Sequence, residues 1–111
     1  MNFFKKIIAT LRLNEAVRQA NNAHKKTGQR YYVMPTSGAS GKLIIMDRRN
    51  FRKLKQKRYI THRAFVRDLE VECFYCTPYR NGTGALTKEA ELIKRKNYFM
   101  WLEQVSKMRR A

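Results

Sequence analysis

Residues 29–60 read QRYYVMPTSGASGKLIIMDRRNFRKLKQKRYI. Two short apolar runs, at 30–34 and 42–46, flank a loop that is rich in proline, serine and glycine. Such runs, separated by turn-forming residues, are typical of two antiparallel strands. Seven of the eleven residues from 48 to 58 are basic. The stretch therefore predicts a β-hairpin that leads directly into a basic helix.

The basic helix expected over 48–58 gives the strongest indication of a partner. Asp47 or Asn50 can cap its start, and Phe51 and Leu54 can hold it to a core. Like charges along one helix repel one another, and bound phosphate groups would relieve that repulsion. Arginine also offers paired donors that fit phosphate or the edge of guanine. The alternative is a charged face that contacts only solvent.

Alternation along the first apolar run places Tyr31 and Val33 on one face and Tyr32 and Met34 on the other. Both faces are apolar, so the hairpin is either covered on both sides or leaves one tyrosine exposed. An exposed tyrosine can stack on an unpaired base. The loop at 35–41 lacks the Lys-Ser/Thr ending of a phosphate-binding loop, and we interpret it as a hairpin loop.

Helices are expected before the hairpin. Within 1–13, apolar residues recur at helical spacing, namely Phe4, Ile7, Ile8 and Leu11. This stripe predicts a helix that docks on the core, with a membrane-surface anchor or a partner-binding helix as alternatives. Asn14 can cap a second helix, or the first can continue, and Gly28 can end it in the left-handed conformation.

Two further helices are expected after the basic one. Thr61 can cap a helix over 62–76, with an apolar stripe made by Phe65, Val66, Leu69, Cys73 and Cys76. Thr87 can cap a last helix that runs to about Lys107, with a stripe that forms core or an oligomer seam: Tyr98, Trp101, Leu102, Val105 and Met108. The predicted fold is a single α+β domain over 1–111, with one or two N-terminal helices, a two-stranded hairpin and three helices. Helices must pack on the hairpin because an isolated hairpin is marginally stable.

Cys73 and Cys76 are the two cysteines of the chain. One close pair is no disulfide framework, so it can be two packed thiols, half of a zinc site or a redox pair. Structural zinc usually needs four ligands, and His24 and His62 lack the spacing of a zinc finger. At the end of a helix, before Pro78, the helix dipole opposes a thiolate. We favour packed thiols and expect neither a metal nor a cofactor.

The charge balance indicates a polyanionic partner. The 111 residues hold 25 basic and 8 acidic side chains, a formal charge of +17, which suits nucleic acid or an anionic membrane. No window approaches the roughly 18 apolar residues of a membrane span, and no leader is recognised. We expect a cytoplasmic protein, or one packaged in a phage particle. Asp47, Glu70 and Glu72 lack an accompanying histidine or metal pattern, so we expect no enzyme.

Three strings carry a resemblance: RYYVMP at 30–35, GKLIIMDRRNFRKLKQKRYI at 41–60 and ECFYCTPY at 72–79. Over about residues 14–105, the chain resembles a group of short basic proteins carried by anaerobic gut bacteria and their phages or mobile elements. The resemblance implies a phage or mobile-element setting. It implies no activity, fold or site.

The leading functional prediction is a nucleic-acid-binding protein without catalysis, contacting DNA or RNA through phosphates. The predicted contacts are Lys42, Arg48, Arg49, Arg52, Lys53, Lys55, Lys57, Arg58, Lys94, Arg95 and Lys96. The alternative is a small structural or assembly protein of a phage or mobile element, which self-associates or binds an assembly partner through its N- or C-terminal helix. Phosphate contacts alone carry no sequence information, so base-specific recognition is not predicted.

Overall fold

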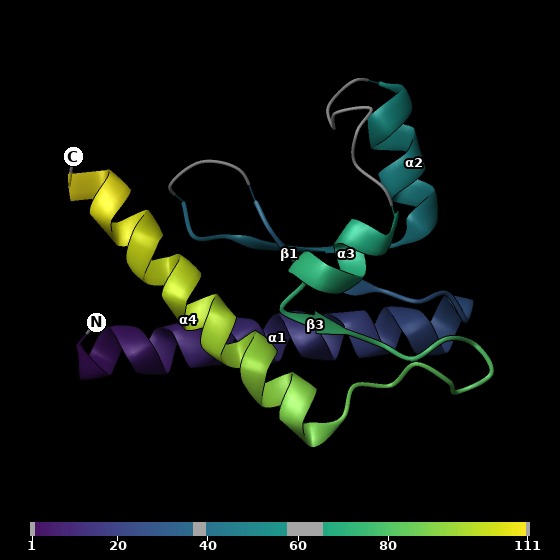
Figure 1. Cartoon of the computed structure of the whole chain (residues 1–111), viewed down its shortest axis with the longest axis horizontal. Coiled ribbons are helices and arrows are strands. Elements are labelled where there is room, and N and C mark those ends of the chain that lie inside the picture. Colours follow the sequence, from purple (N-terminus) through teal and green to yellow (C-terminus); the bar gives the residue numbers. More distant parts are fainter. Residues whose placement is uncertain (1, 37–39, 58–65, 111) are drawn as a thin grey trace.

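The structure is a computed structural model that describes residues 2–36, 40–57 and 66–110 (Figure 1). The described residues form four helices and a three-stranded antiparallel sheet, which confirms the predicted α+β class. The elements, in chain order, are α1 (Phe3–Thr27), β1 (Tyr32–Pro35), β2 (Leu43–Met46), α2 (Arg48–Gln56), α3 (Val66–Glu72), β3 (Tyr75–Cys76) and α4 (Lys88–Arg110).

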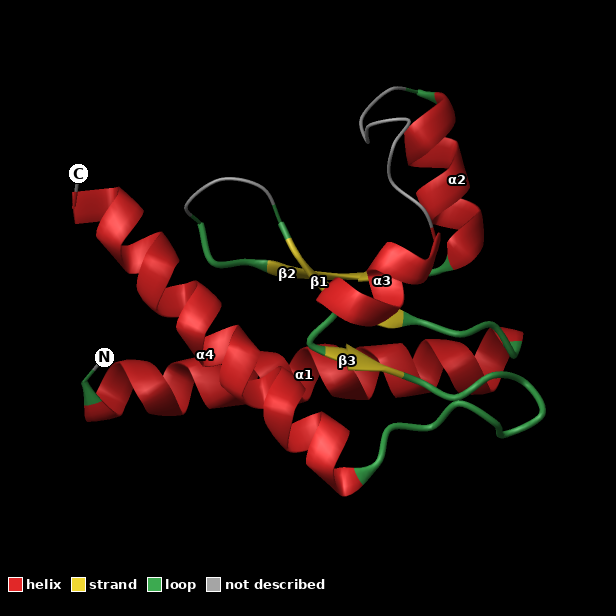
Figure 2. Ribbon diagram, in the orientation of Figure 1, coloured by secondary structure: helices red, strands yellow, loops and turns green. Residues whose placement is uncertain are grey.

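The sheet has the strand order β2-β1-β3 (Figure 2). The predicted hairpin is confirmed, with Tyr32 opposite Met46 and Pro35 opposite Leu43. The prediction of only two strands is wrong, because Tyr32 also pairs with Cys76 of β3. β1 is therefore the central strand of the described sheet, and its two edges are both occupied.

The helix predicted over 62–76 is shorter at its C-terminal end than expected. α3 ends at Glu72, and the predicted cap and the residues at 58–65 lie outside the described residues. The chain leaves the helix because sheet pairing takes over its backbone hydrogen bonds. Phe74 N donates to Val33 O at 2.8 Å, and Thr77 N donates to Tyr31 O at 2.9 Å. The spacing of the apolar residues fits one more helical turn as well as it fits a strand, so the sequence did not reveal β3.

The N-terminal segment forms one continuous helix, so the predicted cap at Asn14 is wrong and the alternative of continuation is right. Asn2 caps the start of α1, because its side chain accepts from Lys5 N at 2.8 Å. Gly28 ends it as predicted, with φ of 73°, and its N–H donates to His24 O at 2.7 Å.

α1 faces the core with a different stripe from the predicted one. Its buried residues are Ala9, Leu13, Ala16 and Ala20, and the predicted docking residues Phe4, Ile7, Ile8 and Leu11 are exposed. The small alanine side chains let β1 and β2 lie close to the helix, and the long Tyr98 side chain of α4 also reaches it. Tyr98 of α4 is fully buried, and its hydroxyl donates to Ala9 O at 2.9 Å. The small volume of the alanine side chains, rather than the number of large apolar residues, decided which face of α1 is buried.

The sheet separates two hydrophobic clusters. The cluster on the side of α1 and α4 contains Ala9, Leu13, Ala16, Ala20, Val33, Phe74 and Tyr98. The cluster on the side of α2 and α3 contains Tyr32, Met34, Met46, Phe51, Leu69, Cys73 and Cys76. The predicted alternation of β1 is thus confirmed, and β1 is covered on both faces, whereas Ile44 of β2 is 40 % exposed. Tyr32 is fully buried, so the base stacking expected of an exposed tyrosine does not apply to it.

α4 begins as predicted, with Thr87 Oγ1 accepting from Ala90 N at 3.1 Å. Of its predicted stripe, Tyr98 and Val105 are buried, and Met108 is 60 % exposed. Met108 therefore does not belong to the core, because α4 extends past the elements that cover its middle (Figure 1). Among the described helices, none is long and apolar enough to cross a membrane.

Candidate nucleic-acid interface

α2 is fixed to the domain at one side and rises away from the sheet (Figure 1). Asp47 caps its start as predicted, because its carboxylate accepts from Asn50 N at 2.7 Å. Phe51 is 4 % exposed and packs into the hydrophobic cluster on the side of the sheet that faces α2 and α3. Leu54 is half-buried and packs against the same cluster. These contacts leave the opposite side of the helix to solvent.

The exposed side of α2 carries a row of cations. Arg49, Arg52 and Lys53 are all exposed, and their spacing of three and four residues places them on one helix face. Within the described ranges, no carboxylate lies at ion-pair distance from any of them. We call these three residues the α2 basic face. Lys57 is also exposed, Lys55 is half-buried and Arg58 lies outside the described residues.

Arg48, at the first position of α2, turns toward the domain. Its Nη2 donates to the Tyr79 hydroxyl at 3.1 Å, and its guanidinium carbon lies 5.4 Å from the centre of the Tyr79 ring. The Tyr79 hydroxyl in turn donates to Glu70 Oε1 at 2.7 Å. Tyr79 thus links the start of α2 to α3.

Arg30 contacts the same tyrosine. Its guanidinium carbon lies 4.2 Å from the centre of the Tyr79 ring, and its Nη1 lies 4.0 Å from Glu70 Oε1. The residue is only 9 % exposed. Gly84 has a φ of 77°, and its backbone packs against Arg30 and Tyr79. A Cβ at that position would clash with the Arg30 guanidinium. The loop that contains Tyr79 and Gly84 therefore holds Arg30 in place.

A cleft of about 600 Å³ opens over this cluster. We call it the arginine cleft; its lining residues are Gly28, Gln29, Arg30, Arg48, Tyr79, Arg80, Asn81 and Thr83. Arg80 is exposed, and its Nη2 donates to Thr27 O at 2.9 Å, which fixes it at the end of α1. Three guanidinium groups thus reach one cleft from three parts of the chain.

The donors of the arginine cleft exceed its internal acceptors. Each guanidinium carries five N–H groups, and Nε of Arg30 and Nε of Arg48 are buried with no hydrogen-bond partner in the described part of the chain. The charge of the Glu70 carboxylate cannot balance three cations. An anion with several oxygens, such as a phosphate, would accept from paired guanidinium donors and balance the remaining charge.

Not all predicted contacts lie at this site. Lys94 of α4 is half-buried, and its Nζ donates to Glu70 O at 2.7 Å and to Cys73 O at 3.1 Å. It therefore satisfies carbonyl groups at the end of α3. This role inside the domain was not visible in the charge run that predicted a surface contact.

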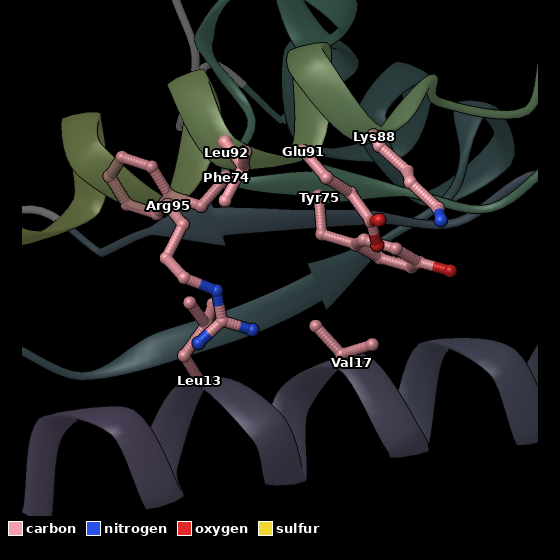
Figure 3. Close-up of a pocket in the computed structure, with 8 residues that line it drawn as sticks. All are labelled: Leu13, Val17, Phe74, Tyr75, Lys88, Glu91, Leu92 and Arg95. Carbon is pink, nitrogen blue, oxygen red and sulfur yellow. The ribbon is translucent and has the colours of Figure 1, made fainter. Parts of the chain in front are cut away.

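Arg95 and Lys96 lie on α4, which covers the other face of the sheet from α2. Figure 3 shows Arg95 extending toward α1 at a cavity of about 270 Å³, which Leu13 and Phe74 also line. Arg95 Nη2 donates to Asn14 Oδ1 at 3.1 Å. Lys96 is exposed. These cations do not join the α2 basic face.

Lys42 is exposed at the start of β2, whereas α2 follows the end of that strand. It lines a groove together with Arg12 and Glu15 of α1. The ten predicted residues that the structure describes therefore lie on α2 and its C-cap, next to β2, and on α4. Sequence reasoning missed Arg30, Tyr79 and Arg80, because the three are isolated in sequence and only folding brings them together.

Among the described residues, no group of three or more His, Cys, Asp and Glu side chains is arranged to hold a metal ion. Both cysteines are buried, each 2 % exposed. Comparison of the chain with protein families, with curated proteins and with solved structures finds no match. The function is therefore argued from the geometry of the site alone.

Proposed function

We propose that the chain binds nucleic acid through the arginine cleft and the α2 basic face, without catalysing a reaction on it. The observation that supports this most directly is the convergence of Arg30, Arg48 and Arg80 on one cleft. Arg48 also begins α2, the helix that carries the exposed cations Arg49, Arg52 and Lys53.

The spacing of the cations suits a phosphate backbone. Arg48 and Lys53 are five residues apart, which corresponds to about 7.5 Å along a helix axis. Phosphates of one strand of a duplex follow one another at about 3.4 Å along its axis. A strand that runs along α2 would meet two or three phosphates, and one more would lie in the arginine cleft.

We expect this binding to depend little on base sequence. Phosphate contacts position a nucleic acid without identifying its bases. Tyr32 is buried, and two guanidinium groups lie over the ring of Tyr79, so neither tyrosine offers a free stacking face.

The test is binding of the purified protein to duplex DNA, single-stranded DNA and RNA of equal length, titrated across salt. Affinity should fall steeply with salt, because phosphate contacts release counterions. A preference among the three would identify the substrate. No binding at low salt would exclude the proposal.

Variants then locate the contact surface. Replacing Arg49, Arg52 and Lys53 together by Gln should lower the slope of log K against log salt by about 2.7, since each lost phosphate contact removes about 0.9. The matched control replaces exposed Lys5, Lys25 and Lys107 by Gln, which removes the same charge elsewhere. Equal losses in both triple variants would show that net charge, and not α2, carries the affinity.

A single variant tests the cleft separately. Arg80 is exposed, so Arg80→Gln should leave the stability of the fold unchanged and reduce the salt slope by about 0.9. Arg18→Gln is its control, because Arg18 is equally exposed and pairs with Glu15 on the outer side of α1. An unchanged slope for Arg80→Gln would remove the cleft from the interface.

A second candidate is a structural or assembly protein of a phage or mobile element. It is favoured by the exposed apolar side chains at the start of α1, namely Phe3, Phe4, Ile7, Ile8 and Leu11. Contiguous apolar surface is uncommon on monomers. Sedimentation velocity over a range of concentrations tests it: self-association that disappears in a Phe4→Ser/Ile8→Ser variant supports assembly, and a monomer throughout excludes self-assembly.

A further inference from the structure

Beneath the arginine cleft lies a pair of cysteines. Cys73 directly follows α3, and Cys76 lies in β3 beside the central strand. Both thiols belong to the cluster on the side of α2 and α3, and each residue is 2 % exposed. Cys73 Sγ donates to Glu70 O at 3.5 Å, and the two thiols lie close enough to shift each other's pKa.

Arg30 connects this pair to the cleft. Its Nη2 donates to Cys76 Sγ at 3.0 Å, while the other side of the guanidinium contacts Tyr79 and lines the cleft. Arg30 therefore joins the cleft directly to the thiol of Cys76.

The charge of Arg30 favours the thiolate form of Cys76. A cation that is nine-tenths buried needs a negative partner close by. In the described part of the chain, the nearest carboxylate is Glu70, at 4.0 Å and with a side chain that is 40 % exposed. The sulfur of Cys76 is nearer, and as a thiolate it would balance the buried guanidinium.

The groups around the two sulfurs shift the pKa values of the two thiols in opposite directions. The neighbouring Cys73 thiol lowers the pKa of Cys76, burial opposes this, and the Arg30 guanidinium and Lys94 lower it further, to about 6. The proximity of Cys76 and burial raise the pKa of Cys73. The site therefore pairs one thiolate with one protonated thiol near neutral pH, the arrangement that reactive dithiols use.

We propose that Cys73 and Cys76 form a site of reversible oxidation that takes a small hydroperoxide as its oxidant and closes to an intramolecular disulfide, releasing Arg30 toward the arginine cleft. The Cys76 thiolate attacks one peroxide oxygen, the O–O bond breaks and Cys76 becomes a sulfenic acid, while hydroxide leaves and takes a proton. Cys73 then attacks the Cys76 sulfur, the S–O bond breaks, and the leaving hydroxyl takes the Cys73 proton as water. The two thiols lose two electrons and the peroxide gains them.

The disulfide changes the electrostatics of the cleft. Oxidation removes the negative sulfur at 3.0 Å from Arg30, and Glu70 remains as the nearby anion. Arg30 then gains more from a phosphate in the cleft than it does in the reduced protein. This consequence rests on the proposed nucleic-acid binding, and we expect the oxidised protein to bind several-fold more tightly.

The full-length reduced protein is treated with hydrogen peroxide and its intact mass is followed. Wild type should lose two hydrogen atoms and regain them with a thiol reductant. Cys73→Ser should stop at the sulfenic acid, trapped as a dimedone adduct on Cys76, and Cys76→Ser should form neither product. Free thiols that persist in the folded wild type, while the denatured chain oxidises, would overturn the site.

Two variants test the role of Arg30. At pH 5, below the pKa of Cys76, Arg30→Gln should slow the first oxidation step about tenfold for each unit by which that pKa rises, since the thiolate fraction then falls about tenfold per unit. Arg30→Lys keeps the charge and should restore part of the rate, even if both variants are less stable. Equal rates in wild type and Arg30→Gln would overturn the assignment of Arg30.

Binding to duplex DNA and to inorganic phosphate is then compared between the reduced and oxidised proteins. Tighter binding after oxidation, lost in Arg30→Gln, supports the release of Arg30. Disulfide formation with unchanged affinity overturns that release. Absence of nucleic-acid binding in both redox states overturns the proposed function, whereas the mass measurement still reports on the dithiol.

Discussion

The guanidinium of Arg30 lies over the ring of Tyr79, with 4.2 Å between the guanidinium carbon and the ring centre. The two residues lie at the same end of two neighbouring antiparallel strands, Arg30 before β1 and Tyr79 after β3. Their contact joins the charged cleft to the buried cysteines. It also places the Tyr79 hydroxyl where it receives a hydrogen bond from Arg48 and donates one to Glu70.

Removing that hydroxyl should weaken the cluster. Tyr79→Phe loses two hydrogen bonds with charged partners, so we expect the free energy of unfolding to fall by about 2 kcal/mol. Urea denaturation measures it. The control is Tyr31→Phe, whose hydroxyl takes part in one weaker contact, with Thr27 at 3.3 Å. Equal losses for the two variants would contradict a special role of the Tyr79 hydroxyl.

A pair of glycines tests how tightly the loop packs on Arg30. Gly82 and Gly84 both have positive φ, at 84° and 77°, so alanine strains the backbone at either position by about 1 kcal/mol. A Cβ at Gly82 meets open space, whereas one at Gly84 meets Arg30 and Tyr79. Gly84→Ala should therefore be the more destabilising of the two by urea denaturation, and should weaken nucleic-acid binding, whereas Gly82→Ala should not.

Two lysines of α4 allow the stability contribution of a hydrogen-bonded lysine to be compared with that of an exposed one. Lys94→Gln removes charge-assisted hydrogen bonds to two carbonyls at the end of α3 and should lower the free energy of unfolding by about 1.5 kcal/mol. Lys96→Gln, at an exposed position, should stay within about 0.5 kcal/mol of wild type. Thermal denaturation at equal pH compares them. A neutral effect of Lys94→Gln would return this lysine to the surface contacts that the charge run predicts.

The cysteine pair should leave a signature in the pH dependence of stability. The pKa of Cys76 is lowered to about 6 in the folded protein from 9.0, so its contribution is fully present above pH 9 and is lost as pH falls through about 6. Unfolding experiments between pH 5 and 9 should therefore show stability rising with pH over this window, and more weakly in Cys76→Ser. Thiolate absorbance gives the folded pKa directly.

The same titration identifies the cause of the shift. The neighbouring Cys73 thiol is the largest influence that lowers the pKa of Cys76. Cys73→Ala should therefore move the titration of Cys76 to higher pH. An unchanged midpoint would show that Arg30 and Lys94 suffice, and a midpoint near 9 in wild type would contradict the thiolate altogether.

The sequence by itself determined the local elements of this protein. The alternation in RYYVM and KLIIM set the hairpin and its two faces, Asp47 and Thr87 set the starts of α2 and α4, and Gly28 set the end of α1. Each of these depends on neighbours within a few residues, so the pattern is visible in the linear chain. The charge of α2 is visible for the same reason.

Tertiary structure alone decided the third strand, the buried face of α1 and the arginine cleft. Residues 73–76 leave the helical pattern because β1 offers backbone partners that the linear chain does not reveal. α1 buries alanines because its close packing against the sheet needs small volumes. Arg30, Tyr79 and Arg80 are unremarkable in sequence, and they form a site because folding brings one end of α1, the start of α2 and a loop after β3 to the same cleft.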